Sequence, residues 1–86
     1  MPERDLQPEE VAGLIALYYA CDGSTKSHIP IEFFRKKLRG PYKQQADKIL
    51  KKLRRRGFVH VHKGRTKSYG ITKEGINKLR ELRLIK

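Results

Sequence analysis

Residues 46–72 read ADKILKKLRRRGFVHVHKGRTKSYGIT, and the spacing of apolar residues changes within this stretch. Near its start, apolar residues recur at intervals of three, one and three positions, the pattern of one helical face; they are Ala46, Ile49, Leu50 and Leu53. From Val59 onward, Val59 and Val61 alternate with two histidines. Beyond Gly64, Tyr69 and Ile71 again stand two positions apart. Alternation of this kind is typical of strands. The stretch therefore predicts a helix followed by a two-stranded hairpin.

Glycine and proline residues place the boundaries of these elements. The pair Gly40-Pro41 ends one helix and begins the next, and Gly57 suits the position just past a helix end. Three arginines, residues 54–56, lie where the negative end of the helix dipole stabilises cations. We expect the third helix to run from about residue 41 to residue 56 and the hairpin to cover residues 58–71. Thr72 is suited to cap a final helix.

Two further helices are expected before this stretch. The first begins at Pro8, and its residues 11–21 carry no charge. An uncharged helix is usually buried more than halfway round, either by its own domain or by a second copy. Residues 25–29 form an extended connection, after which Pro30 begins a second helix with an inward face of Ile31, Phe34 and Leu38. The chain is of the size of one domain, residues 1–86.

The order helix, extended segment, helix, turn, helix, hairpin and helix is an α+β arrangement. In this order of elements, the sequence resembles the winged helix-turn-helix family over essentially the whole length of the chain. Ala46-x-x-Ile49-Leu50-x-x-Leu53-x-x-x-Gly57-Phe58-Val59 looks like the end of the family's recognition helix, and Tyr69-Gly70-Ile71-Thr72-x-x-Gly75-x-x-x-Leu79 looks like its return strand and last helix. The chain is similar to small archaeal and bacterial transcription regulators of this type. The resemblance implies a three-helix core, a two-stranded β-hairpin wing and a C-terminal helix, with the third helix in the DNA major groove and the wing on the flanking backbone.

The charge of the chain is unevenly distributed. Residues 1–25 contain one Lys or Arg and five Asp or Glu, a net charge of −4, whereas residues 26–86 contain 20 and four, a net charge of +16. A positive field of this size attracts polyanions, and nucleic acid is the densest common one. Adaptation to high temperature also enriches Lys and Arg, but it usually enriches Glu as well, and Glu is scarce after residue 25. The composition therefore favours nucleic-acid binding.

Candidate contact residues lie on the third helix. A polar row opposite the apolar face consists of Gln44, Lys48, Lys51 and Arg55, spaced by four, three and four. The amino-terminal half of the helix should enter the groove most deeply. We therefore expect five residues to lie near the bases, namely Tyr42, Lys43, Gln44, Gln45 and Lys48. We expect three others to lie near phosphate, namely Lys51, Lys52 and Arg55. A merely solvated helix face would carry similar residues, and Asp47 is spaced to pair with Lys51.

The predicted wing adds three cations around Gly64, namely Lys63, Arg65 and Lys67. Cations on a hairpin tip are suited to a minor groove or its phosphates. A charged hairpin also prevents edge-to-edge strand pairing, which is an alternative role for Lys63 and Lys67. Arg65, at the tip, is the strongest candidate of the three.

Neither catalytic nor metal chemistry is predicted. His60 and His62 share one face of a strand, but no carboxylate or thiolate obviously joins them as a further metal ligand. Cys21 lies on the apolar face of the first helix, where a thiol is usually inert, and a single cysteine fits a reducing cytoplasm. Catalytic arrangements, cofactor fingerprints and an apolar run of about 18 residues are not found. We expect a cytoplasmic, non-enzymatic protein without cofactor, metal or membrane contact.

Three functions stay open at this point. The first is a transcription regulator that binds double-stranded DNA, with a possible homodimer through the 8–21 helix and the C-terminal helix. The second is an RNA- or ribosome-associated winged-helix protein, whose composition would be similar. Duplex DNA is favoured because the major groove of A-form RNA is too narrow for a helix. The last possibility is a protein-interaction module. In such a module we would expect little charge on the third helix, which is strongly charged in this chain.

Overall fold

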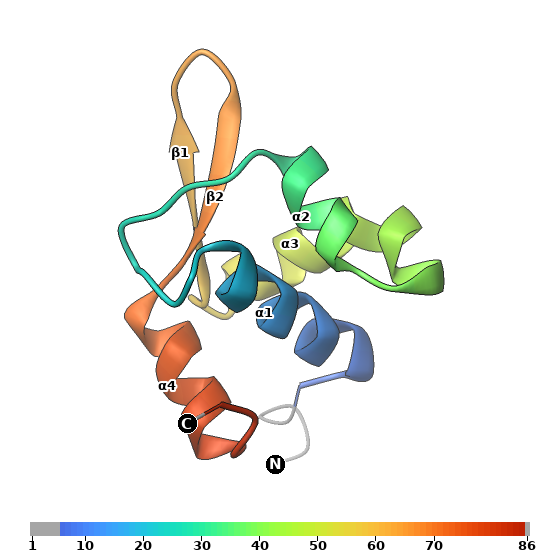
Figure 1. The fold of residues 1–86 in the computed structure, drawn as a ribbon, viewed down its shortest axis with the longest axis vertical. Coiled ribbons are helices and arrows are strands. Elements are labelled where there is room, and N and C mark those ends of the chain that lie inside the picture. The colour runs from blue at the N-terminus through green and yellow to red at the C-terminus, as the bar shows by residue number, and fades with distance from the viewer. Residues whose placement is uncertain (1–5, 86) are drawn as a thin grey trace.

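The structure, a computed structural model, describes residues 6–85, so residues 1–5 and 86 of the predicted domain lie outside the described part. Its elements follow the expected order (Figure 1): α1 (Pro8–Ala20), α2 (Ile31–Lys37), a 3-10 helix η2 (Gly40–Gln45), α3 (Ala46–Arg55), β1 (Val59–Lys63), β2 (Lys67–Ile71) and α4 (Lys73–Glu81). The helices gather around one core, and the hairpin projects from it. This is the predicted α+β class, a winged helix-turn-helix arrangement.

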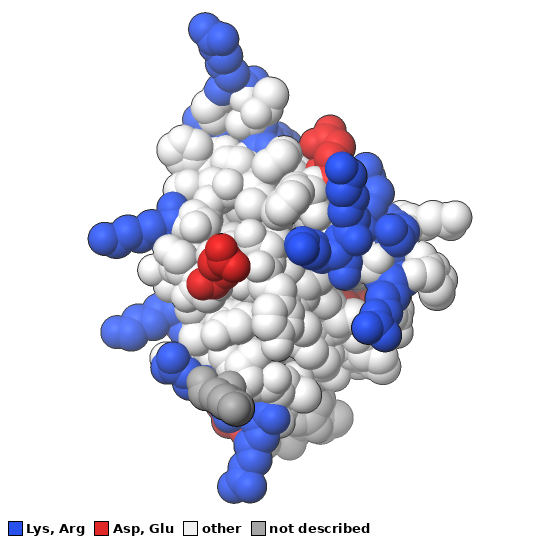
Figure 2. Space-filling model, in the orientation of Figure 1, with Lys and Arg blue, Asp and Glu red and all other residues white. Residues whose placement is uncertain are grey.

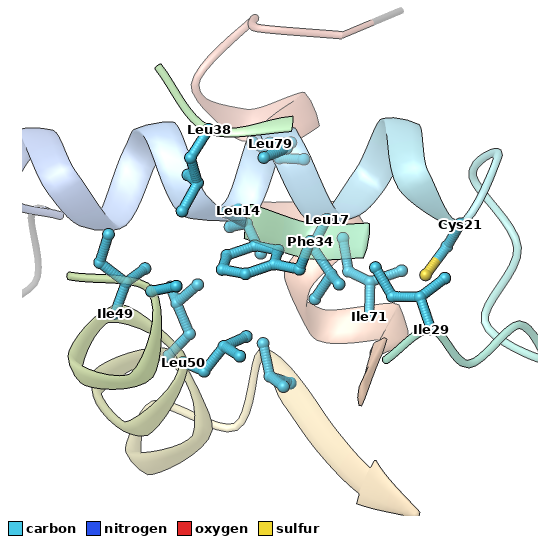
Figure 3. Close-up of a cluster of buried hydrophobic side chains, with 14 of the residues drawn as sticks. Leu14, Leu17, Cys21, Ile29, Phe34, Leu38, Ile49, Leu50, Ile71 and Leu79 are labelled. Atoms are coloured by element: carbon cyan, nitrogen blue, oxygen red, sulfur yellow. The ribbon is translucent and has the colours of Figure 1, made fainter. Parts of the chain in front are cut away.

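One cluster of buried apolar side chains joins the helices (Figure 3). Phe34 of α2 is fully buried and lies between side chains of α1, including Leu14 and Leu17, and side chains of α3, including Ile49 and Leu50. Burying a side chain of this kind contributes about 1.5–3 kcal/mol. The apolar pattern that predicted the third helix is therefore the pattern that attaches α3 to the rest of the molecule.

Helices α1 and α3 approach each other closely at Gly13. This glycine is buried, and a Cβ atom built on it would overlap Cγ2 of Ile49. The missing side chain lets the backbone of α1 lie directly against α3. The contact helps to fix the position of α3, whose opposite face is the candidate functional surface.

Two ion pairs also join the beginning of α1 to α3. Lys52 Nζ lies 2.8 Å from Glu9 Oε2, and Arg56 Nε lies 2.7 Å from Glu10 Oε2. The hydrogen bond from Lys52 lowers the pKa of Glu9. Burial raises the pKa of Glu10, but hydrogen bonds from Arg56 and from the backbone N–H of Gln7 outweigh it, so the pKa of Glu10 is also lowered. Acidic residues of α1 thus offset two of the cations that follow them in the chain.

The prediction of one continuous third helix over residues 41–56 is wrong at its start. Residues 40–45 form the 3-10 helix η2, and the α-helix begins only at Ala46. Gln45 has φ −102° and ψ 11°, which interrupts the α-helical geometry at this point. Residues 43–45 are all exposed, so no side chain of theirs packs this turn onto the core and holds it in the α-helical form. At the other end, Gly57 has φ +82°, as expected past a helix end.

The hairpin agrees with the prediction in its extent. Strands β1 and β2 are antiparallel, with Val59 opposite Ile71 and Lys63 opposite Lys67. The extended segment before α2 adds an isolated bridge from Ile29 to Tyr69 at the edge of β2. The hydroxyl of Thr72 accepts a hydrogen bond from the Gly75 N–H at 3.1 Å, which confirms its capping role.

Candidate nucleic-acid interface

Helix α3 has a row of cations on the side away from the core. Its apolar residues are buried, as predicted, whereas Lys48, Lys51 and Arg55 are exposed. Among the described residues, no carboxylate forms an ion pair with any of these three side chains. Their charges are therefore open to an external polyanion.

The 3-10 helix places further polar groups beside the beginning of α3. Lys43, Gln44 and Gln45 are exposed there and offer amide and ammonium groups to solvent. Tyr42 is placed differently, because its ring is half-buried and packs against the core cluster. It lines an apolar groove with residues of α1 that include Ile15. Of the residues expected near bases, Tyr42 is thus the one partly engaged by the protein itself.

Lys52 is directed toward α1 rather than along the exposed row. Its ammonium forms the 2.8 Å ion pair with Glu9, and its side chain is 39 % exposed. A phosphate contact was expected of it, but the neighbouring carboxylate neutralises part of its charge. Lys52 and Glu9 lie 43 positions apart in the chain, so local spacing gave no sign of this pairing.

A cleft of about 370 Å³ separates α3 from the wing and brings together cations of both. Its lining residues are Asp47, Leu50, Lys51, Arg54, Val61, Lys63, Lys67 and Tyr69. Three of the predicted contact residues, Lys51, Lys63 and Lys67, therefore meet in one cleft although they come from two elements. The apolar residues form part of its walls and the cations give it a positive charge.

Arg54 belongs to this cleft, and the sequence analysis did not select it as a contact. It was assigned only to the negative end of the helix dipole. Arg54 follows Lys51 by three positions, so the two share a helix face, and this spacing was the signal available. A second hollow on the surface is lined by Lys51, Arg54 and Arg55 alone.

Asp47 also lines the cleft and is its only acidic residue. The pairing expected between Asp47 and Lys51 is not formed, because neither takes part in any of the ion pairs of the described residues. Asp47 occupies the first turn of α3, where the helix dipole stabilises a negative charge. The cleft therefore keeps a large excess of positive charge.

The tip of the wing carries Arg65, which is exposed in the turn between β1 and β2. Figure 2 shows Lys and Arg at the end of the wing, gathered on the α2 side and projecting along the opposite edge and the α4 end, with a largely uncharged area over α1. The last turn of α2 carries Arg35, Lys36 and Lys37. Positive charge therefore extends beyond α3 to two flanking elements.

Cys21 and the histidines are the residues that the sequence offered for redox or metal chemistry. Cys21 is buried, and burial raises the pKa of its thiol, which favours the unreactive protonated form. Within residues 6–85, no group of three or more His, Cys, Asp or Glu side chains is arranged to hold a metal ion. No helix in that part of the chain has the length and apolar character needed to cross a membrane.

Comparison with known proteins gives a likeness of fold. No protein-family model matches the sequence, and no curated protein matches it significantly. The chain is similar in structure to AF1382 from Archaeoglobus fulgidus, known from a high-resolution crystal structure, with a TM-score of 0.70 and 20 % sequence identity. The similarity covers 95 % of this chain and 88 % of that protein. At this level of identity it supports the fold alone.

Proposed function

We propose that the protein binds double-stranded DNA and regulates transcription, with α3 in the major groove and the wing on the flanking backbone. The observation that carries this proposal is the cleft between α3 and the hairpin. Lys51 and Arg54 line it from the helix, and Lys63 and Lys67 line it from the wing. Cations on both sides of one cleft suit the phosphate backbone of a duplex.

Different residues would supply affinity and sequence reading. Amide side chains can form paired hydrogen bonds with base edges, which is the role proposed for Gln44 and Gln45, the exposed last residues of η2 directly before α3. Cations of the later turns, including Arg55, would hold phosphate. No step of this action is catalytic: the protein would occlude or recruit the transcription machinery at its site.

RNA is the alternative ligand, because phosphate attracts the same cations. One feature favours duplex DNA. Exposed cations lie on one helix, α3, and the major groove of B-form DNA admits a helix whereas that of A-form RNA does not.

Homodimer formation stays part of the proposal, with a smaller surface than the sequence indicated. Leu14 and Leu17 of α1 and Leu79 of α4 are buried within the chain and are not available to a partner. Tyr19 of α1, 58 % exposed, lines an apolar groove of about 400 Å³. We propose that a second copy covers this groove. Analytical ultracentrifugation should show dimers that Tyr19→Glu converts to monomers; a wild-type monomer at high concentration would refute this part.

The main test is a fluorescence anisotropy titration with mixed-sequence DNA duplex and the matched RNA duplex at several salt concentrations. It compares the wild type with a Lys48→Ala/Lys51→Ala/Arg55→Ala variant. The logarithm of the binding constant should fall with the logarithm of salt concentration by roughly 0.9 for each DNA phosphate contacted. For the variant, the magnitude of this slope should be smaller by roughly 0.9 for each phosphate contact removed.

A matched control removes three exposed cations that belong neither to α3 nor to the wing strands, at Lys26, Lys73 and Arg80. The two triple variants have the same net charge, so a loss specific to α3 separates a binding surface from a general field effect. Equal losses in both variants would contradict the assignment of α3. Tighter binding of the RNA duplex would favour the RNA-associated alternative.

A further inference from the structure

The base of the wing is joined to the segment that precedes α2. Ile29 and Tyr69 exchange two backbone hydrogen bonds, of 2.9 Å from Ile29 N and 2.7 Å from Tyr69 N. These bonds form an isolated antiparallel bridge at the edge of β2 that is not paired with β1, so Ile29 lies beside β2 and β1 lies on its other side. Attraction or repulsion between the side chains of this segment and those of β1 can therefore affect the position of the wing.

Three histidines meet on one face of this sheet. His28 precedes Ile29, and its ring centre lies 5.0 Å from that of His60 and 4.8 Å from that of His62. His60 and His62 are two positions apart on β1, so both side chains are on the same face. The rings of His28 and His60 meet edge to face, at 88°. His28 therefore reaches across β2 to both histidines of β1.

Gly70 makes this contact possible. It lies opposite His60 in the register and is buried. A Cβ atom at this position would be 2.6 Å from His60 Nε2 and 2.6 Å from the Ser27 carbonyl oxygen. Both contacts are closer than a carbon atom tolerates, so a side chain on Gly70 would push the two segments apart. The cluster is thus built into the backbone of β2 as well as into the histidines.

The stability of the histidine cluster depends on the charge of its rings. Loss of water around the ring, followed by the positive charges of His60 and His62, lowers the pKa of His28 below its ordinary value of 6.5. The residues of β2 on this face, Ser68 and Gly70, do not titrate. Like charges at these separations repel each other, so a positive charge on His28 is disfavoured beside the other two rings.

We propose that the three histidines form a proton-sensitive contact: the neutral rings hold the segment before α2 against the base of the wing, and protonation releases it. Imidazole groups are suited to this role because they change charge near physiological pH. The stabilising contribution should be complete above about pH 6.5 and should be lost as pH falls through the lower value of the folded protein, since the unfolded chain then binds the proton more readily. The inference concerns the wing itself and does not depend on the ligand of α3.

Proton NMR can test it directly, because the chain contains three histidines and all three belong to the cluster. In EDTA-containing buffer without nucleic acid, the His28 ring signal should titrate below pH 6.5. In a His60→Gln/His62→Gln variant, its pKa should rise toward the ordinary value. A His28 titration at the ordinary value in both proteins would overturn the proposal.

Hydrogen exchange of the bridge supplies the second readout. Between about pH 7.5 and pH 5, the protection factors of the Ile29 and Tyr69 amides should fall relative to that of Leu53, which is in the core of α3. In a His28→Gln variant this relative fall should disappear, and since His28 is exposed the variant should fold. An unchanged protection ratio in the wild type, or the same fall in the variant, would show that the cluster does not control the wing.

Discussion

Arg56 donates two hydrogen bonds to the carboxylate of Glu10, from Nε to Oε2 at 2.7 Å and from Nη2 to Oε1 at 3.2 Å. Glu10 lies in the first turn of α1 and Arg56 directly follows α3, so the pair holds the end of α3 against α1. Glu10 is only 3 % exposed, and a buried carboxylate is costly unless it is paired.

The first prediction concerns this pair. Replacing Glu10 with Ala should lower the free energy of unfolding by about 2 kcal/mol, less than the about 3–5 kcal/mol of a fully buried pair, because the Arg56 side chain is 26 % exposed. Urea unfolding measures the change. Glu9→Ala is the matched control, since it removes the more exposed pair with Lys52 and should cost less. Equal losses would argue against a special role for Glu10.

A second prediction follows from the lowered pKa of Glu10, whose ordinary value is 4.5. Between the folded value and 4.5, the unfolded chain binds more protons than the folded protein, so stability rises with pH. The advantage of the wild type over Glu10→Gln should be complete above about pH 4.5 and should shrink as pH falls through the folded value. Urea unfolding at a series of pH values checks this. A difference that does not change with pH would mean that the ionised carboxylate is not what stabilises the contact.

Gly13 gives a third prediction with an unusual sign. In most helices Gly→Ala is favourable by about 1 kcal/mol, but the new methyl group here would overlap Ile49 Cγ2. We expect Gly13→Ala to destabilise the protein by about 1–3 kcal/mol, as overpacking does. Thermal or urea unfolding measures this. In a double-mutant cycle with Ile49→Ala, which removes the overlapping group, the two losses should be less than additive. A stabilised Gly13→Ala protein would show that the helices have room to separate.

The parts of the fold that local patterns predicted are those that depend on neighbours in the chain. The hairpin follows from alternation between Val59 and Ile71, and the end of α3 from Gly57, whose positive φ only glycine adopts easily. The 3-10 helix before Ala46 was missed because residues 41–45 have helix-compatible chemistry. Whether residues 43–45 pack against the rest of the molecule depends on the tertiary structure, in which they are exposed, and local spacing does not contain that information.

The candidate site was predicted to the same extent and for the same reason. Spacing on one helix identified Lys48, Lys51 and Arg55, because helical faces repeat regularly. It could not show that Lys52 pairs with Glu9, nor that Arg54 lines a cleft together with residues of the wing. Those relationships join residues that are far apart in the chain, so they need the tertiary structure.

The last prediction tests the cleft through the residue that the sequence analysis overlooked. Arg54→Ala should weaken DNA binding and reduce the salt slope by roughly 0.9, the effect of one lost phosphate contact, whereas Arg80→Ala on α4 should change the slope little. Combining Arg54→Ala with Lys67→Ala, on the opposite wall of the cleft, should reduce the slope by roughly twice that amount if each cation holds its own phosphate. Fluorescence anisotropy at several salt concentrations measures all four proteins under conditions where circular dichroism confirms that they are folded. If Arg54→Ala behaves like Arg80→Ala, Arg54 holds no phosphate, and the contacts made by α3 would be restricted to the exposed row of Lys48, Lys51 and Arg55.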